Sequence, residues 1–172
     1  MNSLTLSELN TLSADEFTRV LGGVFEHSPW VAEQVQAQRP FSSIEELHAA
    51  MVRVIEDAGT EAQLRLIRSH PELAGKAAIR GELTPESNAE QAGAGLDRCS
   101  PEEYATLTAL NQAYREKFGF PFILAVKGYD RRGIIDEFRR RAALTPEEEM
   151  AESLKQIYKI GRFRLEDLVQ LG

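Results

Sequence analysis

Signals for the start of an α-helix recur along the whole chain and limit the folds it can adopt. In a capping box, a Ser or Thr oxygen accepts a hydrogen bond from a backbone N–H, and a Glu or Gln three residues later reaches back. Four sites match this pattern: Ser13–Glu16, Ser42–Glu45, Thr60–Gln63 and Ser100–Glu103. Proline suits the first helical position, because its missing N–H would have no partner there. It follows a polar residue at Ser28-Pro29, Thr84-Pro85, Ser100-Pro101 and Thr145-Pro146. Helix starts this frequent predict an all-α protein.

Between these starts the apolar residues repeat with helical spacing. Leu47, Met51, Val54 and Ile55 continue from Ile44 on one face of a helix that ends before Gly59. A second stripe predicts a buried face on the helix that begins at Pro101, formed by Tyr104, Leu107, Leu110, Ala113, Tyr114 and Lys117. The last helix is expected over about residues 146–168, with Gly161 as a candidate bend. No repeat or linker divides the chain, so we expect one compact domain over residues 1–172 with about seven or eight helices.

One stretch breaks the helical pattern. Residues 118–128, FGFPFILAVKG, are apolar at nearly every position, with Gly119 and Pro121 early and Gly128 at the end. This predicts a short extended segment or buried strand near residues 120–127. Buried N–H and C=O groups need hydrogen-bond partners. On the sequence, those partners are either a bound ligand with many polar edges or the loops and water around a core segment.

Charge and composition exclude several classes of function. The net charge of −7 disfavours a general nucleic-acid binder, whose surface is basic. Cys99 is the only cysteine, so no internal disulfide can form, and we interpret it as a loop thiol without a role. No apolar run reaches the roughly 18 residues that would span a membrane. The N-terminus does not match a secretory signal, nor the C-terminus a peroxisomal one, so we expect a cytoplasmic protein.

The three histidines do not form a metal-binding pattern. His27, His48 and His70 show no i, i+4 pair and no H-E-x-x-H motif, so no metal site is expected. His27 reads as a turn residue and His48 as a partly buried or surface residue of its helix. His70 differs because Pro71 biases its backbone away from the helical region and fixes it at a helix exit. A fixed position suits a catalytic base, although a plain helix end remains the alternative.

A polar helix face follows about twenty residues later, in 83-LTPESNAEQAGAGLD-97. Ser87, Glu90 and Gln91 lie at i, i+3 and i+4 and therefore share one face. A hydroxyl, a carboxylate and an amide together suit a heterocycle with amide edges, whereas the alternative is an ordinary solvated face. The small residues Ala92–Gly95 permit close approach of a neighbour or ligand.

Two arginine clusters complete the candidates. In 162-RFRL-165 the arginines are two residues apart and do not share a helix face, so one could form a carboxylate clamp while the other is solvated. The run 138-FRRRA-142 is interpreted as a solvated helix C-terminus.

Taken together, SHPELAGK (residues 69–76), TPESNAEQAGAGLD, LNQAYREKFGFPFILAVKG and RFRLEDL resemble the 2-oxo-4-hydroxy-4-carboxy-5-ureidoimidazoline (OHCU) decarboxylases over nearly the whole chain. The resemblance implies an all-α, cofactor-free and metal-free enzyme of urate degradation that converts OHCU to (S)-allantoin and CO₂. It is also compatible with a homodimer, but the sequence does not determine the oligomeric state.

The resemblance also assigns roles by position. It implies that His70 and Glu90 are catalytic, without deciding which of them delivers the proton that sets the stereochemistry. It implies that the substrate is bound by Pro71, Ser87, Gln91, the extended run Phe122, Ile123, Leu124, Ala125 and Val126, and a C-terminal arginine. Arg164 matches that arginine better than Arg162, because it directly precedes the leucine of RLEDL. Two other functions stay open on the residues: a non-catalytic all-α interaction module, and a hydrolase of allantoin or a related ureide.

Overall fold

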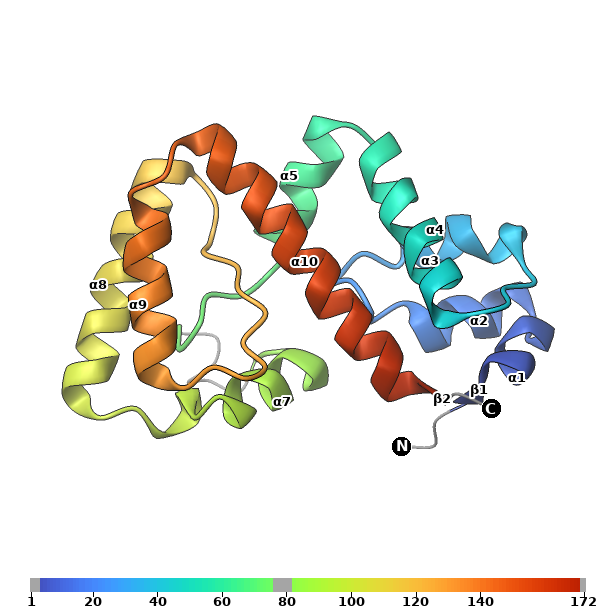
Figure 1. The fold of residues 1–172 in the computed structure, drawn as a ribbon, viewed down its shortest axis with the longest axis horizontal. Coiled ribbons are helices and arrows are strands. Elements are labelled where there is room, and N and C mark those ends of the chain that lie inside the picture. Colours follow the sequence, from blue (N-terminus) through green and yellow to red (C-terminus); the bar gives the residue numbers. More distant parts are fainter. Residues whose placement is uncertain (1–3, 76–81, 171–172) are drawn as a thin grey trace. The chain divides into compact units, whose positions relative to one another are not determined.

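The computed structural model describes residues 4–75 and 82–170. Within them lie nine α-helices, two 3₁₀ turns and one pair of two-residue strands, so the all-α prediction is confirmed (Figure 1). The expected number of about seven or eight helices is close to this, and the short α1 (Leu6–Thr11) had no predicted start. None of the helices in the described part of the chain is both long and apolar enough to cross a membrane. The chain divides by its contacts into two units, which we describe separately.

The first unit is made from both ends of the chain, Met1–Ser69 and Tyr158–Gly172. Strand β1 (Leu4–Thr5) pairs in parallel with β2 (Val169–Gln170), with Leu4 opposite Val169 (Figure 1). Helix α3 packs against α2 and α4. The other elements of this unit are α1 Leu6–Thr11, α2 Ala14–Leu21, α3 Trp30–Val35, η1 Gln36–Gln38, α4 Ile44–Asp57 and α5 Thr60–Arg68. The unit also contains the part of α10 (Pro146–Leu168) that begins at Tyr158.

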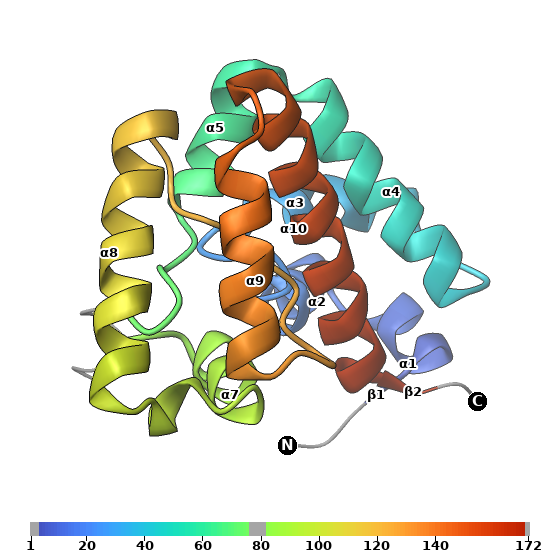
Figure 2. The ribbon, with the colours of Figure 1, turned by 60° about the vertical axis from the view of Figure 1, so that its left-hand side comes forward.

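The second unit, His70–Ile157, contains most of the expected site. Its elements are α7 Pro85–Gly93, η2 Leu96–Arg98, α8 Pro101–Phe118, α9 Arg131–Ala142 and the part of α10 before Tyr158. Helices α8 and α9 lie side by side (Figures 1 and 2). The chain that joins them includes residues 121–126, where the sequence predicted an extended segment or a short buried strand; these residues belong to no helix and to no strand.

Most helix starts follow the local sequence. Ser13, Thr84 and Ser100 cap helices as expected, and Ser100 with Glu103 forms a complete capping box. Three starts differ from the prediction. At α3, Pro29 is the cap and not the first helical residue. Ser43 rather than Ser42 caps α4, while Ser42 also bonds Glu46. Thr60 is the first residue of α5 and not its cap, because Gly59 takes that place at φ 92°.

The predicted buried face of α8 was wrong in part. The buried residues are Leu107, Asn111 and Tyr114, which lie at i, i+4 and i+7. Tyr104, Ala113 and Lys117 are exposed instead. The buried stripe runs through a polar residue, Asn111, so hydrophobicity alone placed it incorrectly.

Candidate active site

His70 is a buried residue at the start of the second unit. It directly follows Ser69, the C-terminal cap of α5, and is 8% exposed, with its Nε2 atom shielded from solvent. Pro71 beside it is half-buried. The last residue of the SHPELAGK motif, Lys76, lies outside the described residues.

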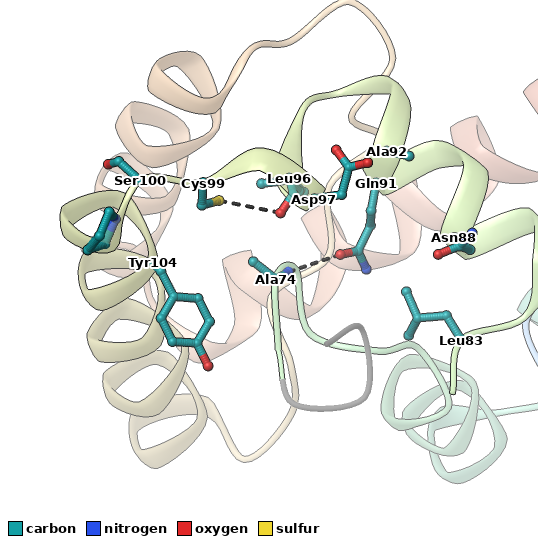
Figure 3. A pocket seen from close by; sticks show the side chains of 11 residues that line it. Ala74, Leu83, Asn88, Gln91, Ala92, Leu96, Asp97, Cys99, Ser100 and Tyr104 are labelled. Atoms are coloured by element: carbon teal, nitrogen blue, oxygen red, sulfur yellow. Dashed lines mark hydrogen bonds between the residues drawn. The ribbon is translucent and has the colours of Figure 1, made fainter. Parts of the chain in front are cut away.

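Three hydrogen bonds from two helices hold the segment that follows Pro71. The side chain of Gln91 on α7 accepts from the Ala74 N–H through Oε1 at 2.9 Å (Figure 3). It also donates to the Glu72 carbonyl through Nε2 at 3.3 Å. Asn111 on α8 donates from Nδ2 to the Leu73 carbonyl at 2.9 Å. Ala74 has a left-handed φ of 52°, which costs a residue with a Cβ about 1–2 kcal/mol. The hydrogen bonds therefore fix a backbone shape that the segment would not adopt alone.

The polar face of α7 is turned inward. Thr84 caps the helix by accepting from the Ser87 N–H, with Pro85 as its first residue. Ser87 and Gln91 are the buried residues of this helix, at 4% and 6% exposure, and Glu90 between them is half-buried. The interpretation of this face as an ordinary solvated surface is therefore wrong. Gln91 still has one amide N–H and one oxygen lone pair beyond its two bonds, which a ligand could use.

The small residues after α7 allow a neighbour to come close, as the sequence suggested. A Cβ at Gly95 would lie 2.9 Å from Arg131 Nη1, and this nitrogen donates to the Gly95 carbonyl at 3.1 Å. Gly95 also has a φ of 82°, which favours glycine. Arg131 pairs in addition with Glu103, and this pairing, together with the Ser100 N–H, lowers the pKa of Glu103. The close neighbour at Gly95 is thus a side chain of the protein.

The run Phe122–Val126 is buried at every position, and the protein itself satisfies part of its backbone. Arg141 Nη1 donates to the Ile123 carbonyl, and Gln156 Oε1 accepts from the Ala125 N–H at 3.0 Å. The Val126 carbonyl accepts from the Tyr129 N–H at 2.9 Å. These partners are largely side chains of following helices, which neither sequence interpretation of the segment had included.

Arg141 corrects the interpretation of 138-FRRRA-142 as a solvated terminus. Arg139 and Arg140 are exposed as expected, but Arg141 is completely buried. It pairs with the equally buried Glu149, which also accepts a hydrogen bond from the Tyr114 hydroxyl. Burial, together with this carboxylate, raises the pKa of Tyr114 well above its usual value. A buried charge needs such a partner, because leaving it unpaired is costly.

The missed residues had a detectable signal in their spacing. Arg141 lies at i+7 from Ile134 and i+3 from Phe138, on the buried stripe of α9. Asn111 occupies the same kind of position between Leu107 and Tyr114. A polar residue inside an apolar stripe could have marked both as buried, although it could not have identified their partners.

Arg162 and Arg164 lie in different environments, as their two-residue spacing predicted. Arg162 bonds Glu45 at 2.8 Å and Glu166 at 3.1 Å, and both carboxylates are exposed. Arg164 is 3% exposed, and its Nη1 donates to Glu26 at 3.1 Å and to the Gly23 carbonyl at 3.1 Å. Both arginines belong to the first unit, whereas the other expected site residues belong to the second.

A cavity of about 560 Å³ lies beside α7 in the second unit (Figure 3). Its lining includes Gln91, Asn88, Leu96, Cys99 and Tyr104, but of the expected site residues it shares only Gln91. Cys99 donates from Sγ to the Leu96 carbonyl at 3.4 Å, and burial raises the pKa of its thiol. A raised pKa makes a thiol less reactive at neutral pH. Among the described residues, no group of three or more His, Cys, Asp or Glu is placed to hold a metal ion.

Comparison with known proteins identifies relatives along the whole chain. The family model described as OHCU decarboxylase matches residues 10–166. The 2-oxo-4-hydroxy-4-carboxy-5-ureidoimidazoline decarboxylase of Haloferax volcanii is 44% identical over 96% of both chains. The protein of the same name from Halalkalicoccus jeotgali is 42% identical over 98% of this chain and 93% of its own. The crystal structure of an (S)-allantoin synthase superposes with a TM-score of 0.78 at 28% identity, over 96% of this chain and 54% of that one. The chain belongs to the OHCU decarboxylase family.

Proposed function

We propose that this chain converts OHCU to (S)-allantoin and CO₂ in urate degradation, without a metal or organic cofactor. The observation that carries the proposal is the 44% identity to the Haloferax volcanii decarboxylase over 96% of both chains. The buried polar groups around α7 supply the chemistry that such a substrate needs, since a ureide presents amide donors and acceptors. We also propose that the whole chain acts as one functional domain.

The substrate supplies its own electron sink. Its hydroxyl and carboxylate are on one carbon, next to a C=N bond whose carbon bears the ureido group. When the bond to the carboxylate breaks, CO₂ leaves and the electron pair moves toward the C=N nitrogen, which takes up a proton. The resulting enol loses its hydroxyl proton while the ureido-bearing carbon gains one. The balance is one proton taken up for each CO₂ released, and proton delivery from one face gives one enantiomer.

His70 and Glu90 are proposed to handle the hydroxyl proton and the proton delivery. His70 is buried and lies at a position fixed by Pro71 and by the bonds of Gln91 and Asn111 to residues 72–74. A fixed position favours general acid–base catalysis, because the group must be within hydrogen-bond reach of the reacting proton.

Substrate binding is proposed for Pro71, for Ser87 and Gln91, and for the backbone of Phe122–Val126. Arg164 is proposed as the carboxylate clamp, on the resemblance of RFRLEDL to the family motif. Its buried charge is already paired with Glu26, so a substrate carboxylate would join an existing ion pair.

We further propose a cytoplasmic homodimer, for which light scattering of the purified protein at micromolar concentration is the direct measurement.

The decisive experiment supplies OHCU freshly made from urate to the purified chain and records its decay together with the optical activity of the allantoin formed. We expect His70→Ala and Glu90→Gln to keep the helical circular dichroism spectrum and to lose about 10²–10⁴-fold in rate. His27→Asn is the matched histidine control, because His27 is exposed and asparagine tolerates its φ of 49°. Wild-type turnover by His70→Ala would refute its role. Ammonia release without CO₂ would instead indicate a ureide hydrolase.

A further inference from the structure

The run Phe122–Val126 is held by two buried side chains whose roles the family resemblance did not assign. Arg141 of α9 donates to the Ile123 carbonyl, and Gln156 of α10 accepts from the Ala125 N–H. We propose that Arg141 and Gln156 are positioning residues for the decarboxylation: they hold residues 123 and 125 so that the backbone groups of Leu124 are presented to the substrate on the other side. This inference rests on the proposed function.

The two contacts are linked through α10. Arg141 Nη2 lies 3.3 Å from Ser153 Oγ, and Ser153 is three residues before Gln156 on α10. The amide of Gln156 is oriented by its own Nε2, which donates to Glu152 Oε1 at 3.1 Å, so that its oxygen remains for Ala125. Both anchors are therefore fixed by contacts with α10, through Ser153 and Glu152.

The planar trans peptide then determines where the backbone groups of Leu124 point. Within one trans peptide unit the C=O and the N–H point in opposite directions, so the Leu124 N–H is opposite the Ile123 C=O and the Leu124 C=O is opposite the Ala125 N–H. Ile123 and Ala125 are two residues apart and both bond toward the anchors, so the groups of Leu124 face away from them. Leu124 is only 4% exposed, yet neither its N–H nor its C=O has a hydrogen-bond partner within residues 4–75 and 82–170. A donor and an acceptor on one buried residue match the amide edge of a ureide.

Arg141 can serve as an anchor because its charge is neutralised nearby. Glu149 Oε1 accepts from Arg141 Nε at 2.8 Å, and the guanidinium carbon lies 4.5 Å from the centre of the Phe122 ring. The same side chain thus contacts the segment through a ring and through a carbonyl. Lysine could not reproduce this arrangement, because its ammonium is a single point charge without the planar fork of arginine.

The test compares Gln156→Met, which removes the acceptor for Ala125 without changing charge, with Gln112→Met on the exposed side of α8. Among the residues that the structure describes, Gln112 bonds only the exposed Glu116, at 3.3 Å, so it serves as the matched control. Both variants are assayed for kcat and KM with OHCU and for the Kd of (S)-allantoin. Backbone amide exchange of Leu124 and Ala125 is followed by NMR with and without (S)-allantoin.

We expect the Leu124 amide of the wild type to exchange more slowly when (S)-allantoin is added, and the Ala125 amide to be protected already without it. Gln156→Met is expected to raise KM and the allantoin Kd about tenfold. Gln112→Met should match the wild type.

Two results would overturn the inference. In the first, folded Gln156→Met keeps wild-type KM and Kd, and allantoin leaves the Leu124 amide unchanged although the wild type turns over OHCU. The positioning role would then fail while the proposed function stands. In the second, the wild type does not decarboxylate OHCU, and both proposals fail together.

Discussion

At the scale of single residues, Gly161 shows that tertiary packing can require a particular residue type where the local helical structure does not. A Cβ at this position would lie 2.7 Å from two ring atoms of Phe25, which is itself 2% exposed. Helix α10 continues through the glycine to Leu168. The close approach of a buried ring therefore explains the glycine, and the bend that the sequence suggested stays a prediction.

Replacing Gly161 by alanine is expected to destabilise the protein. The better helix propensity of alanine is worth about 1 kcal/mol, but the new methyl group must displace a buried aromatic ring, and overpacking costs about 1–3 kcal/mol. The 2.7 Å contact with two ring atoms places this cost in the upper part of that range, so we expect a net loss of about 1–2 kcal/mol in the free energy of unfolding, measured by urea denaturation. Gly93→Ala is the control, because a Cβ there meets nothing within 4 Å and should be neutral or stabilising. Equal stability of Gly161→Ala and the wild type would contradict the packing argument.

At the scale of secondary-structure elements, His48 joins α4 to α10. Its Nε2 lies 2.8 Å from the Tyr158 carbonyl oxygen, and as the neutral tautomer protonated there it donates to that carbonyl. Burial lowers the pKa of His48, and the positive charge of Arg162 lowers it further, against the effect of the Tyr158 carbonyl. The folded protein therefore prefers the neutral ring.

This contact predicts a pH dependence of stability. Since the pKa of His48 is lower in the folded protein, the unfolded chain binds the proton first as the pH falls below about 6.5, and stability decreases. We expect the free energy of unfolding to fall between pH 7.5 and 5.5 and to fall less steeply in His48→Gln. Urea titrations of both proteins at several pH values measure the difference in slope. A variant with the wild-type slope would show that His48 does not titrate as proposed.

The same scale shows what the sequence could reveal about the fold and the site. The caps at Ser13, Thr84 and Ser100 were predicted correctly because each is a bond between residues three apart. The partners of Asn111, Arg141 and Gln156 are 38, 18 and 31 residues away, so no local pattern contains them. The inward face of α7 could be proposed from its spacing, but its bonds to residues 72 and 74 depend on how the chain folds back.

At the scale of the whole molecule, the two ends of the chain meet in one unit. Parallel pairing of β1 with β2 joins residues 4–5 to residues 169–170 (Figure 1). The C-terminal part of α10 adds Ile160 and Leu165 to the buried core, and Val169 follows in β2. Arg164 brings the counter-charge for Glu26, which is 1% exposed. The first 69 residues therefore depend on a segment that follows them by almost ninety positions.

Truncation after Ile157 tests this dependence. It removes three buried apolar side chains and leaves the carboxylate of Glu26 without the Arg164 guanidinium, a loss that alone costs about 3–5 kcal/mol for a buried pair. Whole domains have only about 5–15 kcal/mol of stability, so we expect backbone amides of residues 4–69 to lose their protection from hydrogen exchange. Truncation after Gln170 keeps the strand pair and the ion pair, and is expected to retain protection. If residues 4–69 stayed protected after truncation at Ile157, the N-terminal segment would be an independent folding unit. The C-terminal part of α10 would then add stability without completing the core of that segment.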